Sequence, residues 1–147
     1  MKSNPAPLPS ALTRTLGLAL GALALSLGAQ AATGDKAVYE HARAQAKAQY
    51  ETAKAQCKTL AGNAKDVCEE EAKATRKKLE AEAKAVYEGT PKARYQAQVA
   101  IAEADYEVAE ERCDDRSGDA KDLCKKEAKA MLSQAKASAK AEYDAVK

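Results

Sequence analysis

The chain has 147 residues, of which 31% are charged, and its 24 Lys and Arg against 22 Asp and Glu give a formal net charge of +2. It contains six Tyr but no Phe or Trp, and residues 32–147 have only twelve Leu, Ile, Val or Met. A core built mainly from large apolar side chains is therefore not expected, and the fold needs other sources of stability. Charge so evenly divided between the two signs does not indicate a nucleic-acid partner.

Residues 1–31 have the pattern of a secretory signal peptide. Lys2 and Arg14 give a positive start, an apolar run rich in Leu and Ala follows, and Ala29-Gln30-Ala31 matches the small-x-small cleavage pattern. The run, at roughly 15 residues, is too short for an ordinary spanning helix, which needs about 20. We expect Sec-type export, cleavage after Ala31 and no stable membrane span afterwards. The product would be periplasmic or secreted, with balanced charge, because both lost charges are basic.

The rest of the chain has the composition of long helices. Residues 33–61 are rich in Ala, Lys, Gln and Glu, which favour helix, and their apolar residues recur every three or four positions. Further helices are expected over 64–88, 91–117 and 120–147. Between the second and third, Gly89-Thr90-Pro91 supplies a stop, a cap and a proline suited to the first helical position. The predicted fold class is therefore all-α.

The other two helix junctions share one turn pattern. The pattern uses Gly62, Asn63 and Asp66 in the first turn and Gly118, Asp119 and Asp122 in the second. The glycine stands where a helix needs a left-handed residue to end. The Asn or Asp after it is a strong N-cap residue. The carboxylate three positions later would lie in the first helical turn, where the macrodipole favours negative charge.

A cysteine lies on either side of each turn, at Cys57 and Cys68 and at Cys113 and Cys124. Residues equally far from a turn face each other in an antiparallel pair, as a disulfide requires. Four cysteines allow three pairings, and we predict 57–68 and 113–124. A metal site and a redox dithiol are the competing interpretations. Metal fingers usually space paired ligands two to four residues apart, and redox dithiols read Cys-x-x-Cys; the sequence has neither pattern.

The two turns belong to an internal repeat. Residues 36–91 align with 92–147 without a gap, and about 24 of the 56 positions are identical. The six tyrosines pair in this alignment as Tyr39 with Tyr95, Tyr50 with Tyr106, and Tyr87 with Tyr143. We therefore predict two tandem disulfide-clipped antiparallel helical hairpins, residues 32–89 and 90–147. They could stand apart or form an up-down-up-down four-helix bundle, and the tight turn at 89–91 favours folding together.

The motif Cys-x4-Gly-x-Ala-Lys-Asp-x-Cys occurs at 57–68 and 113–124, and Glu-Ala-Lys-Ala follows each copy at 71–74 and 127–130. This pattern resembles a group of small exported proteobacterial proteins, rich in Ala and Lys, that are often labelled TolA-like or cell-envelope proteins. The resemblance covers most of the chain after residue 31. It implies a helical fold and a periplasmic location.

No nucleophile–base–acid set, phosphate-binding loop or EF-hand loop can be assembled, so we predict no catalytic residue, cofactor or metal. His41 is expected on the surface, and the tyrosines are expected to pack with their hydroxyls at the rim. The leading hypothesis is a non-enzymatic structural or interaction protein of the bacterial envelope, with another envelope protein or a second copy as partner. The alternative is a stress-related, chaperone-like protein that holds clients on a helical surface. Thiol–disulfide exchange is the enzymatic alternative.

Overall fold

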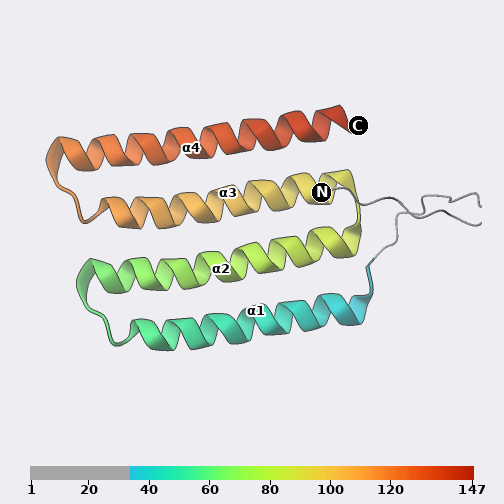
Figure 1. Ribbon diagram of the computed structural model, residues 1–147, viewed down its shortest axis with the longest axis horizontal. Coiled ribbons are helices and arrows are strands. Elements are labelled where there is room, and N and C mark those ends of the chain that lie inside the picture. Colours follow the sequence, from blue (N-terminus) through green and yellow to red (C-terminus); the bar gives the residue numbers. More distant parts are fainter. Residues whose placement is uncertain (1–33) are drawn as a thin grey trace, which may run out of the picture.

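The computed structural model describes residues 34–147, which form four helices and no strand. The helices are α1 (Lys36–Cys57), α2 (Gly62–Glu88), α3 (Pro91–Cys113) and α4 (Gly118–Ala145). They lie antiparallel and side by side in chain order (Figure 1). The prediction of an all-α fold built from two antiparallel hairpins is confirmed. The signal peptide predicted for residues 1–31 lies outside the described residues.

Each helix packs only against its neighbours in the chain. Within residues 34–147, no Cα atom of α1 lies within 8 Å of one in α3 or α4, and α2 is likewise separated from α4. The hairpins fold together through α2 and α3, as the tight turn between them favours. The chain follows the expected up-down-up-down order, and α1 and α4 occupy opposite edges of one layer (Figure 1).

The turn between the hairpins has the predicted geometry. Gly89 adopts a left-handed conformation, with φ of 62°, and its N–H donates to the Ala85 carbonyl at 3.0 Å. The Thr90 hydroxyl accepts a hydrogen bond from the Ala93 N–H at 3.0 Å, and Pro91 begins α3. A left-handed glycine, a capping hydroxyl and a proline thus follow one another and reverse the chain direction.

The two turns within the hairpins differ from the expectation. Helix α1 ends at Cys57, before Gly62, and α3 ends at Cys113, before Gly118. After Cys57, three successive N–H groups donate to carbonyls three residues back. These bonds tighten the last turn, so the α-helix ends before Gly62. The glycines are left-handed, with φ of 57° and 54°. They stand at the start of the second helix of each hairpin and do not end the first.

The residues predicted to cap α2 and α4 do not cap them. Helices α2 and α4 already begin at the glycines, and no described side chain accepts a hydrogen bond from their first N–H groups. Asn63 instead donates through Nδ2 to the Glu111 carbonyl of α3 at 3.2 Å. Because the helices start earlier than expected, Asp66 and Asp122 lie beyond the first turn, and Asp119 is the acidic residue within the first turn of α4.

Alanine supplies most of the core. Nine of the twelve buried apolar residues in the described chain are Ala, and the others are Cys57, Cys113 and Val108. Half of the twelve lie where α2 meets α3, a contact that we call the central seam. Its buried residues are Ala74, Ala85, Ala93, Ala97, Ala104 and Val108. Small side chains let the backbones approach closely, so that many weak contacts accumulate without large apolar groups.

Candidate interaction surface

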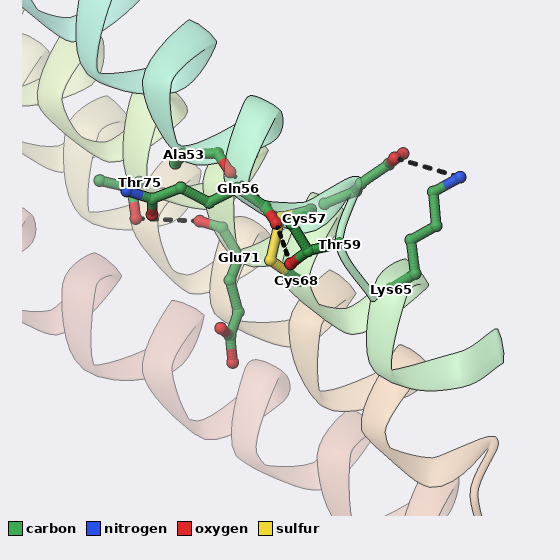
Figure 2. Close-up of a disulfide and its surroundings, with 9 residues drawn as sticks. Ala53, Gln56, Cys57, Thr59, Lys65, Cys68, Glu71 and Thr75 are labelled. Carbon is green, nitrogen blue, oxygen red and sulfur yellow. Dashed lines mark hydrogen bonds and ion pairs between the residues drawn. A yellow bond between two sulfur atoms is a disulfide. The ribbon is translucent and has the colours of Figure 1, made fainter. Parts of the chain in front are cut away.

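The turn end of each hairpin is closed by a disulfide, and both bridges have the predicted pairing. The Cα atoms of Cys57 and Cys68 are 5.6 Å apart, and those of Cys113 and Cys124 are 5.7 Å apart. Figure 2 shows the first bridge between the end of α1 and the start of α2, beside the Thr59 hydroxyl that donates to the Gln56 carbonyl. Disulfides of this kind are compatible with an extracytoplasmic compartment.

The open end of each hairpin is closed by two stacked tyrosines. The ring centroids of Tyr39 and Tyr87 lie 4.8 Å apart, and those of Tyr95 and Tyr143 lie 5.2 Å apart. In the first hairpin the Gly34 N–H also donates to the Tyr87 carbonyl at 2.8 Å. Sequence reasoning matched tyrosines between repeats but did not pair them across a hairpin. Their similar distances from the turn were the available signal.

Ion pairs border the central seam. Lys77 pairs with Glu107 and Lys78 with Asp105, and Arg112 reaches Glu71 at 2.5 Å. Consecutive residues of a helix point about 100° apart, so the two lysines flank the buried alanines on different sides. Exposed pairs of this kind stabilise a protein little. Their geometric role is to fix which residues of α2 face which residues of α3.

Charged contacts also join α3 to α4. Lys136 reaches Glu103 at 2.6 Å, at mid-helix. Near the second disulfide, Asp114 accepts from Lys125 at 3.0 Å and from Lys121 at 3.1 Å. The hydrogen bond from Lys125 and, next to it, the one from Lys121 lower the pKa of the Asp114 carboxyl, and the bond to Asp114 raises the pKa of Lys125. The pairs reinforce the turn that the disulfide closes.

Among the grooves on the surface of the described residues, two differ clearly in the character of their lining. A mixed-charge groove of about 400 Å³ crosses α1, α2 and α3, and its charged lining residues are Arg43, Lys77, Glu80, Lys84, Glu103 and Glu107. An apolar groove of about 210 Å³ lies between α1 and α2 and is lined by Val38, Ala42, Ala83 and Val86, among others. His41 is exposed on α1, as expected. Both grooves are surfaces that a partner could contact.

Across residues 34–147, no group of three or more His, Cys, Asp or Glu is arranged to hold a metal ion. None of the four described helices combines the length and the apolar character needed to cross a bilayer. No family model, curated protein or solved structure matches the chain. The resemblance to exported TolA-like proteins therefore stays a prediction.

Proposed function

We propose that this protein is a non-enzymatic structural or interaction protein of the bacterial cell envelope that works in the periplasm. The observation that supports this most directly is the clipping of each hairpin at both ends, by a disulfide and by a stacked tyrosine pair. Clipped hairpins joined by a close-packed seam make a stiff layer. Such a layer suits a role in which a fixed surface is presented to a partner.

Two features support the compartment. Disulfides persist in oxidising environments such as the bacterial periplasm and are rare in the cytosol, and all four described cysteines are bridged. The pattern of residues 1–31 is that of an export signal. Both features point to the same side of the inner membrane.

The mixed-charge groove suggests the chemistry of the partner. Basic Arg43 and Lys84 lie in it together with acidic Glu80 and Glu103. A surface with both signs interspersed favours a partner that also carries both signs, because complementary charges fix the register of a contact. Another envelope protein or a second copy of this chain fits this description better than a uniformly anionic polymer does.

Photo-crosslinking in intact cells tests the proposal. A crosslinking residue at Lys84, which lines the mixed-charge groove, is expected to capture a discrete envelope protein or a second copy. The matched control is Lys58, an exposed lysine in the turn after α1 and outside this groove. Equal background capture at the two positions, with no defined adduct at Lys84, would overturn the proposal.

One observation favours the alternative of a client-holding protein. Val38 and Val86 of the apolar groove are 63% and 70% exposed. The corresponding positions of the second hairpin, however, carry Arg94 and Glu142, so the apolar patch is confined to one hairpin. An assay of client aggregation would distinguish the two functions. Suppression that is lost in Val86→Glu, which copies the second hairpin, would favour client holding, whereas no suppression at several-fold excess would reject it.

A further inference from the structure

The two edges of the layer repeat the two faces that meet in the central seam. The internal repeat, with its offset of 56 residues, aligns α4 with α2 and α1 with α3. The seam is the contact of α2 with α3. The corresponding face of α4 and the corresponding face of α1 lie at opposite edges, without a neighbouring helix among residues 34–147.

The apolar positions of the seam recur on the outer face of α4. Ala74, Ala81 and Ala85 of α2 correspond to Ala130, Ala137 and Ala141, all three of which are exposed. Residues 130 and 137 lie about 200° around the helix from the buried Ala128 and Ala139, so they point away from α3. Leu123 is 57% exposed and corresponds to Val67, which is half-buried. A helix docked here would cover this leucine.

The outer face of α1 recurs in the same way. Buried Ala93 and Ala104 of α3 correspond to exposed Ala37 and Ala48. Residue 48 lies about 200° around the helix from the buried Ala46, and α1 contacts only α2. The small side chains of this face therefore point away from the layer.

The three ion-paired positions of the seam remain complementary at the edges while losing charge. At the edges, Ser133 and Glu51 take the places of Lys77 and Glu107. Gln134 and Gln49 take the places of Lys78 and Asp105. Glu127 and Gln56 take the places of Glu71 and Arg112. In every pair, the helix that corresponds to the seam's donor helix still carries a hydrogen-bond donor, and the other helix still carries an acceptor. No pair brings like charges together. The contact would therefore keep the register of the seam with weaker attraction.

One polar contact of the seam has no counterpart at the edges. Asn63 donates to the Glu111 carbonyl in the seam, whereas the corresponding Asp119 side chain has no N–H to donate to the Ala55 carbonyl.

Two apolar positions also fit less well than in the seam. His41 stands where Ala97 is buried, and Thr52 stands where Val108 is buried. A larger ring and a hydroxyl at these sites reduce close packing. Together with the missing charges, they favour a reversible contact over a permanent one.

We propose that the outer face of α4 docks on the outer face of α1 of a second copy, in the register that α2 uses on α3. A contact between two different faces is head to tail, and where it does not close into a ring it extends into an open array. Stacking of repeats through nearest-neighbour contacts follows the same principle. This inference names a partner for the structural role proposed above and rests on it.

Restoring two ion pairs tests the register. In sedimentation velocity, the sedimentation coefficient of the oxidised protein is expected to rise with concentration. Ser133→Lys with Gln56→Arg supplies partners for the native Glu51 and Glu127, and it should lower the dissociation constant by about tenfold at low salt. High salt should remove this gain. The control, Ser138→Lys with Gln56→Arg, carries the same charge with its lysine off the face, and it should gain less. Equal gains in the two variants would overturn the proposed register.

Blocking each face tests the head-to-tail arrangement. Ala137→Glu blocks the face of α4, and Ala48→Glu blocks the face of α1, so each variant alone is expected to be monomeric. An equimolar mixture should form a dimer that grows no further, because each variant supplies the face that the other lacks. Unchanged helical circular dichroism and intact disulfides would establish that both variants fold. A mixture that stays monomeric, or wild-type protein that is monomeric up to its solubility limit, would overturn the proposal.

The sedimentation results and the crosslinking results together distinguish failure of the array from failure of the structural role. Monomeric protein together with a foreign adduct at Lys84 would reject the array and keep the structural role. Monomeric protein with no adduct would reject both.

Discussion

Removal of either disulfide is expected to lower the free energy of unfolding by about 3 kcal/mol. Both bridges join cysteines that are 11 residues apart. In the chain-entropy model, closing a loop of roughly that length is worth about 3 kcal/mol at 25 °C. A domain is typically stable by only about 5–15 kcal/mol. One bridge is thus a large share of the total, and the alanine core provides little apolar burial to compensate for its loss.

Paired variants allow this value to be measured. Cys57→Ala with Cys68→Ala removes the first bridge, and Cys113→Ala with Cys124→Ala removes the second. Each pair is expected to lower the melting temperature, followed by circular dichroism, by roughly 10–25 °C. The two losses should be similar because the two loops are equally long. Reductant should lower the melting temperature of the wild-type protein by more than the loss of one bridge does. It should not change the melting temperature of a variant without cysteines. A wild-type melt unaffected by strong reductant would refute the reasoning.

Three further substitutions test the seam, a turn and a surface charge. Ala104→Leu, in the central seam, should lower the free energy of unfolding in urea titrations by about 1–3 kcal/mol, whereas its exposed repeat equivalent Ala48→Leu should change it by less than about 0.5 kcal/mol in dilute solution. Gly62→Ala should lower it by about 1–2 kcal/mol, because a φ of 57° strains any residue with a Cβ even where nothing lies within 4 Å. Lys125 lowers the pKa of Asp114, so the stability from this carboxylate is present at neutral pH and is lost as the pH falls below about 4. Asp114→Asn should therefore show a smaller acid-induced fall in melting temperature.

Each of these three has a contradicting result. Equal losses for Ala104→Leu and Ala48→Leu would mean that the seam is not closely packed. A Gly62→Ala variant as stable as the wild type would show that the turn tolerates another conformation. If acid lowers the melting temperatures of Asp114→Asn and of the wild type equally, the ion pairs of Asp114 with α4 do not contribute to the pH dependence of stability.

The local features of the fold were predictable because the signals for them are local. Gly89, Thr90 and Pro91 specify a left-handed residue, a capping hydroxyl and a fixed φ within three positions. The disulfide pairing followed from equal spacing about a turn. The exact ends of α1 and α3 were not predictable in this way. They depend on whether the last N–H groups bond three or four residues back, and these few residues carry no sequence signal for that choice.

The central seam could not be found from periodicity. A recurrence of apolar residues every three or four positions marks one face of a helix, whereas α2 and α3 each pack on two sides. Alanine occurs on every side of these helices, so spacing alone does not separate buried Ala104 from exposed Ala48. Leu60, Val86 and Met131, three of the few large apolar residues, are exposed. Large apolar side chains were a poor guide here because Ala forms the core.

The scarcity of large apolar residues and the open layer have one physical explanation. Residues 32–147 contain twelve Leu, Ile, Val and Met; six of these are exposed, and Val108 is the one that is buried. The centre of a closed four-helix bundle must be filled by long side chains. A layer has no such centre, because each seam lies between two helices that alanine allows to approach closely. A layer must also end in two edges, and here each edge repeats a face that is buried in the seam. The composition that allows the flat fold therefore also leaves the surfaces through which we expect a second copy to extend it.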